Sequence, residues 1–292
     1  MTSITTNSSA APRVQSRWEF LRRLNFSTWL GVAIVLTLIL CAAFAPILAP
    51  YDPNEQNIIV YLSPPSAENL LGTDQFGRDV LSRLLYGARY SLTIGFLAIL
   101  VALIIGSFLG MIAGYVGRKT DIIVMQIMDV VLAFPSLILG LALVALMGAT
   151  LTNIVIAIAF TAIPAFARIA RAGVLTQRDR EYVQACHAMG FSHTRILFGH
   201  ILPAILPEIL VMASLWMATA VRTEASLAFI GLGLAPPTPT WGGMVREGFD
   251  NILSSFHLAL YPSLAILVLV LALNLIGDGL RDAIDPRLKD VS

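Results

Sequence analysis

The sequence predicts an all-α, polytopic membrane protein with six transmembrane helices. With 57% hydrophobic and only 13% charged residues, and a mean hydropathy of +0.79, the chain falls outside the range of soluble globular proteins. Apolar runs long enough to cross roughly 30 Å of bilayer hydrocarbon recur along it. The six expected spans cover residues 30–48, 92–116, 122–147, 151–170, 205–230 and 258–276.

Prolines fall inside or near the ends of three expected helices, at Pro46, Pro135 and Pro164. Membrane helices tolerate them where neighbouring groups satisfy the freed carbonyls. The first span follows several arginines and could be mistaken for a signal peptide. Its apolar run is too long for that, and Pro46 follows at once, which favours a signal-anchor.

The distribution of basic residues predicts the orientation in the membrane. Fourteen of the 19 lysines and arginines fall in segments that share one side with both termini. Because basic residues are enriched on the cytoplasmic side, both termini are expected in the cytoplasm. The net charge of +1 gives no indication of a nucleic-acid partner, and none is expected.

Four segments follow from these spans. Residues 1–24 are an expected cytoplasmic tail, and 25–90 hold the first transmembrane helix and a periplasmic loop. Residues 91–281 form a core domain with five transmembrane helices and a charged loop at 176–203, and 282–292 form a second cytoplasmic tail. An apolar stripe beside arginines predicts an amphipathic helix on the outer membrane face, in the loop of the second segment; the stripe consists of Val80, Leu81, Leu84 and Leu85.

Gly106, Gly110 and Gly114 form two overlapping Gly-x-x-x-Gly units in the second span. Such small residues let helix backbones approach closely in lipid. The pattern favours packing inside this chain, and dimerisation through the same face is the alternative.

A charged island between two apolar segments, residues 181–203, predicts a short amphipathic helix. Positions i, i+3, i+4 and i+7 give it one apolar face, made of Tyr182, Ala185, Cys186 and Met189. Gly190 is placed to end this helix and Ser192 to cap the next one. A short helix between two spans is expected to dock on another protein, and a partnerless membrane-surface helix is the alternative.

The same island carries a family resemblance. Gln184, Ala185 and Cys186, then Gly190, then the pair Leu202-Pro203 resemble the cytoplasmic loop shared by membrane subunits of ATP-driven importers. That loop has the form Glu-Ala-Ala, three residues, Gly, nine residues, Ile, one residue, Leu-Pro. Here Gln184 replaces the Glu, Cys186 the second Ala and His200 the Ile. The resemblance implies a cytoplasmic coupling helix that contacts an ATP-hydrolysing subunit through Tyr182, Gln184, Ala185, Cys186, Met189 and Gly190.

Four further segments, at residues 45–53, 71–89, 226–244 and 274–289, resemble the dipeptide, oligopeptide and nickel branch of these importers, in particular its second permease subunit. The resemblance covers roughly residues 20–290. It implies a permease in the bacterial inner membrane that forms a path for di- or oligopeptides in a heterodimer with another permease subunit. Its expected partners are two ATP-binding subunits, a periplasmic or lipid-anchored substrate-binding protein and membrane lipid. Relatives in this branch serve nickel complexes, glutathione, oligosaccharides and opine-like compounds.

Catalysis on this chain is not expected. A phosphate loop needs Gly-x-x-x-x-Gly-Lys-Ser/Thr, and the nearest string, at 117–120, misplaces its lysine. Two cysteines and four scattered histidines predict neither a disulfide framework nor a metal site, and no cofactor is expected. His187, His193 and His200 are expected at solvent or at a subunit interface.

Ionisable residues at membrane depth are candidate path residues, and the chain has three, Asp129, Arg222 and Glu224. Asp129 precedes Pro135 and marks either a fixed bend near a cytoplasmic gate or a buried hydrogen bond between helices. Arg222 either attracts a substrate carboxylate or extends to the membrane interface. Two residues apart on a helix, Arg222 and Glu224 are expected to point in different directions.

Two other functional classes fit the sequence less well. An ion-coupled secondary transporter needs coupling-ion sites near the midplane, and this chain has few charges there. A membrane-embedded enzyme needs a catalytic constellation that the sequence does not contain. Neither class explains the charged loop.

Overall fold

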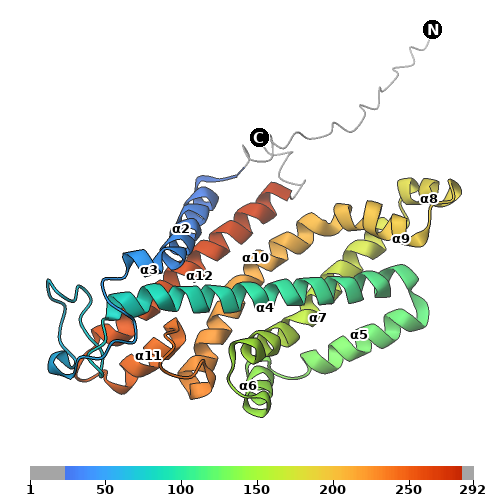
Figure 1. The fold of residues 1–292 in the computed structure, drawn as a ribbon. Coiled ribbons are helices and arrows are strands. Elements are labelled where there is room, and N and C mark those ends of the chain that lie inside the picture. The colour runs from blue at the N-terminus through green and yellow to red at the C-terminus, as the bar shows by residue number, and fades with distance from the viewer. Residues whose placement is uncertain (1–23, 285–292) are drawn as a thin grey trace, which may run out of the picture.

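The computed structural model describes residues 24–284, and within that range it is helical without a β-strand (Figure 1). The predicted tails, 1–24 and 282–292, therefore lie almost entirely outside the described residues. The helices form an elongated bundle with two distinct ends. We call the end formed by residues 49–79 and 233–256 the loop end, and the opposite end, which carries α8, the α8 end.

Five helices in the described range are long and apolar enough to cross a membrane. They are α2 (Phe26–Ala43), α4 (Val80–Val116), α7 (Leu151–Gln177), α10 (Leu202–Leu227) with its flanking turns, and α12 (His257–Ile284). The flanking turns are α9 (His193–Ile196) and two π-helical turns, η2 (Leu197–Ile201) and η3 (Ala228–Leu232). Shorter elements complete the fold: α3 (Ala45–Leu48), η1 (Ile58–Val60), α8 (Glu181–Ala188) and α11 (Trp241–Asp250).

The third expected span is two helices rather than one. α5 (Arg118–Leu132) and α6 (Ser136–Met147) meet at an angle of 87°, and together they supply the sixth crossing. Pro135 lies at the break in an extended conformation. Because proline lacks an amide hydrogen and disfavours a helical residue before it, the chain leaves the helix there.

The segment at 80–90 is not a separate amphipathic helix on the membrane surface, as the sequence predicted. It forms the first turns of α4, whose 37 residues extend over about 55 Å, well beyond the roughly 30 Å of hydrocarbon. Val80 and Arg83 are both buried in this part of the helix. Within the stripe, Val80 and Leu84 pack in hydrophobic clusters with residues of α11 and α12, and the expected boundary at residue 90 falls within one continuous helix.

The prediction of close internal packing by glycines is confirmed. α4 and α7 lie side by side and run in the same direction, with the largest hydrophobic cluster of the described chain around them (Figure 1). A Cβ on Gly110 would overlap the carbonyl oxygen of Ala167, and a Cβ on Gly106 would approach the Ile163 carbonyl oxygen to 2.5 Å. Gly114 faces α7 one turn further along. This glycine stripe brings the two backbones into direct contact.

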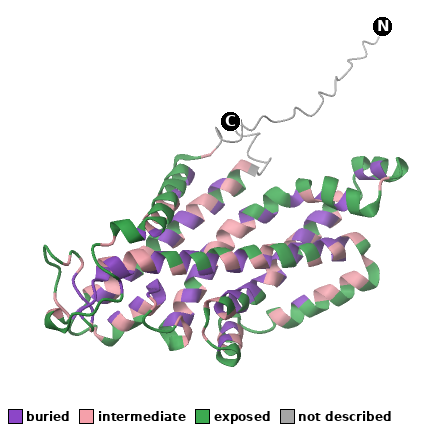
Figure 2. Ribbon diagram, in the orientation of Figure 1, coloured by how far each residue is buried: buried purple, intermediate pink, exposed green. Residues whose placement is uncertain are grey.

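Exposed apolar side chains continue along the outside of the bundle. Figure 2 shows α2 and α5 largely exposed, whereas α4 and α7 are buried along much of their length. Large apolar residues with open surface include Leu36, Ile39, Ile123 and Ile127. A chain with this much apolar surface is stable only in lipid or against another apolar protein surface.

Candidate functional site

Helix α8 projects beyond the end of the bundle, between α7 and α9 (Figure 1). It ends where expected. Met189 is its C-cap, and Gly190 follows with φ +76°, a conformation that favours glycine. Ser192 then accepts a hydrogen bond from the Arg195 amide at 3.4 Å and caps α9, as predicted.

The side of α8 that faces the bundle is made of Val183 and Cys186, which are 0% and 5% exposed. Both belong to the main hydrophobic cluster, together with Ile196 and Leu197. Cys186 was predicted on the docking face, and that prediction is wrong. Its spacing of three residues from Val183, which the sequence analysis did not single out, turns it toward its own chain.

The outward side of α8 carries the other predicted residues. Tyr182 and Met189 are 40% and 63% exposed, and Gln184 and Ala185 are also exposed. The Tyr182 hydroxyl donates to Gln177 Oε1 at 3.1 Å, and its partial burial raises the pKa of the phenol. α8 therefore presents a small surface with an aromatic ring and a flexible thioether, while its opposite side is fixed in the core.

Aromatic and basic side chains attach the loop around α8 to the bundle. Tyr115, at the end of α4, bonds His193 Nδ1 at 2.9 Å, and the His187 ring lies 5.5 Å from that of His193. Arg178 Nη1 donates to the Gly114 carbonyl oxygen at 2.8 Å. These contacts attach the loop around α8 to the α4–α7 pair, and His187 and His193 remain exposed to solvent, as expected.

Of the two arrangements that the sequence suggested for Asp129, the structure shows the hydrogen bond between helices, although this bond is exposed and not buried. Asp129 lies on the surface of α5 and pairs with Arg168 of α7 at 2.6 Å, with both side chains more than half exposed. Asp121 pairs with Arg171 two turns away. The bend itself is at Pro135, six residues further on, so the two aspartates attach α5 to α7 and do not form the bend.

Glu224 and Arg222 point in different directions, as expected. Arg222 is exposed, and its Nη2 donates to Thr219 Oγ1 at 3.0 Å. Glu224 is only 1% exposed and accepts from Ser91 Oγ at 3.2 Å, where the N-terminus of α11 meets α4. Glu224 therefore lines no open surface in this structure, contrary to the expectation that it faces a path.

A buried ionic cluster at the loop end was not predicted. Arg78 contacts Asp74 at 2.6 Å and Glu247 at 3.0 Å, and Arg83 contacts the same two carboxylates at 3.3 and 3.2 Å. Both arginines are 2% exposed. Both arginines were expected outside the membrane, but Glu247 lies more than 160 residues away on α11, and no local pattern indicates that pairing.

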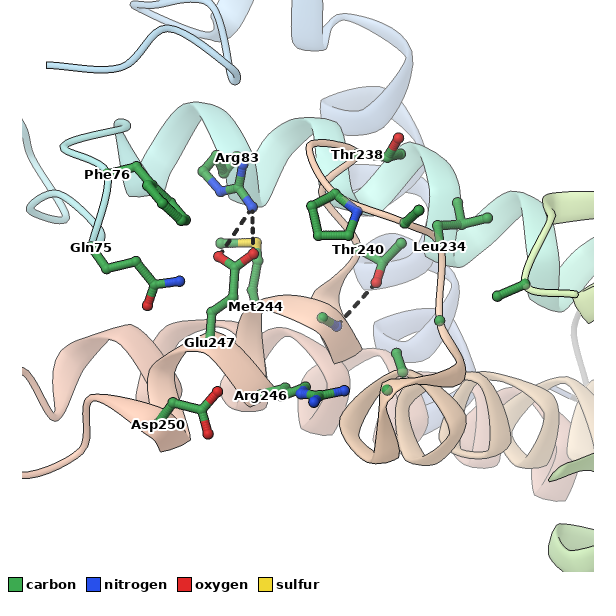
Figure 3. Close-up of a pocket in the computed structure, with 17 residues that line it drawn as sticks. Gln75, Phe76, Arg83, Leu234, Thr238, Thr240, Met244, Arg246, Glu247 and Asp250 are labelled. Atoms are coloured by element: carbon green, nitrogen blue, oxygen red, sulfur yellow. Dashed lines mark hydrogen bonds and ion pairs between the residues drawn. The ribbon is translucent and has the colours of Figure 1, made fainter. Parts of the chain in front are cut away.

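Next to this cluster lies a cavity of 510 Å³ between the start of α4, the chain that follows η3, and α11 (Figure 3). Within residues 24–284, no group of three or more histidine, cysteine or carboxylate side chains is arranged to hold a metal ion.

Comparison with known proteins agrees with the motifs. The family model described as binding-protein-dependent transport system inner membrane component matches residues 106–290. The chain belongs to this family. A second model, the N-terminal TM domain of oligopeptide transport permease C, matches residues 16–65. The chain is therefore a multi-pass permease subunit of a binding-protein-dependent importer, as the resemblance implied.

Individual relatives cover nearly the whole chain. It is 45% identical over 268 residues to the di/tripeptide transport system permease protein DppC of Pseudomonas aeruginosa, covering 90% of this chain and 88% of that one. It is 43% identical over 273 residues to the glutathione transport system permease protein GsiD of Pectobacterium atrosepticum, covering 93% and 90%. A chain of the inward-facing MetNI methionine ABC transporter shares the fold, with a TM-score of 0.58 at 19% identity over 70% of this chain and 97% of that one.

Proposed function

We propose that this permease imports di- or oligopeptides across the bacterial inner membrane as one of two different membrane subunits. Several relatives support this cargo, because three of them are named as permeases for di- or tripeptides, dipeptides and D,D-dipeptides. The partners would be two ATP-binding subunits and a substrate-binding protein. The excess of basic residues on one side supports cytoplasmic termini and a cytoplasmic α8, which leaves the loop end in the periplasm.

The observation that carries the mechanism is the two-sided structure of α8. Val183 and Cys186 fix one side in the hydrophobic core, while Tyr182, Ala185 and Met189 remain open on the other. A partner that moves the open side displaces the helix as a rigid body, because its inner side is continuous with the core packing. ATP-driven closure of the partner subunits would then switch the membrane helices between inward and outward openings.

The proposed absence of an ATPase site on this chain follows from the string at 117–120. Gly117 and Arg118 have φ values of +67° and +50° in the tight turn between α4 and α5. A phosphate loop instead joins a strand to a helix and carries its lysine directly after the second glycine. The free energy for transport would come entirely from the partner subunits.

Glutathione is a second candidate cargo, favoured by the 43% identity to a glutathione permease. The two candidate cargoes are distinguished by measuring uptake in cells whose only peptide importer is the complete transporter. Peptide import predicts that labelled dialanine accumulates and that excess glutathione does not compete. Dialanine uptake at the level of cells without the permease would reject the peptide assignment.

A further inference from the structure

The cavity at the loop end has the dimensions and lining of a small-molecule site. Its volume of 510 Å³ lies within the usual range for ligand pockets. Part of its wall is apolar and consists of Phe76, Leu234 and Met244, and charged side chains project from α11 (Figure 3). Arg83 and Glu247 of the ionic cluster form part of its wall, and the proposed coupling through α8 does not involve it.

The charges around the cavity fall into two groups. Arg83 and Glu247 neutralise each other at 3.2 Å within the buried ionic cluster. Arg246 and Asp250 also line the cavity, but neither forms an ion pair with another residue in the range 24–284. The cavity wall thus offers one cation and one anion for which the described chain supplies no counter-ion.

The positions of these two residues on α11 are compatible with the two ends of a short peptide. Arg246 and Asp250 are four residues apart on α11, so they share one face with Cβ atoms about 5–6 Å apart. An extended dipeptide spans at most about 7 Å between its ends. A guanidinium can bind a terminal carboxylate through two parallel hydrogen bonds, and an aspartate can accept hydrogen bonds from a terminal ammonium.

The position of Arg246 depends on a glycine. Gly231 has φ +99° where η3 turns into the following chain, and a Cβ built on it would overlap Arg246 Nη1. Only glycine combines this backbone conformation with room for the guanidinium. The guanidinium is therefore held against the backbone of Gly231 at the cavity wall.

We propose that this cavity is a receiving site for short zwitterionic peptides, with Arg246 on the peptide carboxylate and Asp250 on the peptide ammonium. Peptide side chains would lie against Phe76, Leu234 and Met244. The proposal rests on the proposed peptide import and adds to it a binding site on the permease itself, separate from the binding protein.

The test uses the assembled membrane complex with its ATPase subunits, in nanodiscs and without the binding protein. The probe is the dipeptide alanyl-photoleucine, which is cross-linked by light and mapped by mass spectrometry. We expect labelling in residues 231–250, and at least tenfold less with the same dipeptide acetylated and amidated at its ends. Arg246→Gln should reduce labelling by the free dipeptide at least tenfold. The matched control Arg89→Gln changes an exposed arginine outside the cavity and should leave labelling unchanged.

Labelling elsewhere only, equal labelling by the blocked probe, or full labelling of the Arg246→Gln complex would each overturn the proposal. Dialanine uptake by the wild-type transporter with its binding protein is measured in parallel. Normal uptake without labelling in the cavity rejects this site alone, whereas absent uptake rejects the proposed cargo itself.

Discussion

Removing the guanidinium of Arg83 should release the loop at 49–79 from the bundle. Arg83 contacts Asp74 and Glu247, and its Nη1 also lies 3.3 and 3.4 Å from the carbonyl oxygens of Pro53 and Pro237. One side chain thus connects the loop at 49–79, the chain after η3 and α11. The methionine of Arg83→Met keeps an unbranched apolar side chain at this position, but all of these polar contacts are lost.

The cost can be bounded from the geometry. Breaking a buried ion pair by removing one partner typically costs about 3–5 kcal/mol. Arg78 still contacts both carboxylates in the variant, and Glu247 is 23% exposed, so we expect a value near the lower end, about 3 kcal/mol. At about 1.4 kcal/mol per factor of ten, local opening of the loop should become about 100-fold more frequent.

Hydrogen exchange measures this opening directly. The amides of Leu62 and Thr73 are bonded within the loop, to the carbonyl oxygens of Asp74 and Ser63 at 3.1 and 3.0 Å. Their exchange in the complex should accelerate about 100-fold in Arg83→Met if exchange follows local opening. Arg89→Met, which removes an exposed arginine, is the control. Equal exchange in the two variants would refute the view that the buried cluster holds the loop.

Three shorter predictions follow. Gly110→Leu should prevent stable insertion or assembly, because the added side chain would meet the backbone of Ala167. The control Gly140→Leu should assemble normally, because no heavy atom lies within 4 Å of a Cβ at that position. Assembly is measured on a gel of the purified complex. A hydrophilic maleimide should leave Cys186 unlabelled in the folded complex and label it in SDS, and rapid labelling of the folded protein would show that α8 is not packed as described. Arg222→Leu should slow peptide uptake without affecting assembly, and Arg222→Lys should slow uptake less. Normal uptake by the leucine variant would mean that this exposed arginine does not contact the transported peptide.

Features that depend on local sequence were predictable. Apolar runs located the membrane helices, since their length relates directly to bilayer thickness. The glycine stripe on α4 predicted close packing because a missing Cβ is visible in the sequence itself. Gly190 indicated the end of α8, and Ser192 indicated the start of α9, through the known conformations of helix ends.

Features that depend on long-range contacts were not predictable. The periodicity of α8 predicted an apolar face. It did not indicate that Val183 and Cys186 would be buried against the bundle while Ala185 stays exposed to solvent. The run at 122–147 is apolar apart from Gln126, Asp129 and Ser136, and no feature of it indicates how sharply the chain bends at Pro135. Glu224 was assigned to a path from its depth alone, whereas its burial results from α4 and α11 packing against α10.

The central claim is that α8 couples this permease to ATP hydrolysis on another subunit. Ala185→Asp tests it most directly, because Ala185 is exposed on α8 and an added carboxylate disturbs a docked partner without disturbing the core. The measurement is the amount of ATPase subunit that co-purifies with the permease, together with dialanine uptake. Ala67→Asp, the same change at an exposed position of the loop end, is the control for retention of the ATPase subunits.

The account predicts that Ala185→Asp inserts in the membrane at the wild-type level, retains little ATPase subunit or hydrolyses ATP without transport, and imports no dialanine. Ala67→Asp should retain the ATPase subunits fully. Wild-type retention of the ATPase subunits together with wild-type uptake in Ala185→Asp would contradict the assignment of α8 as the coupling helix.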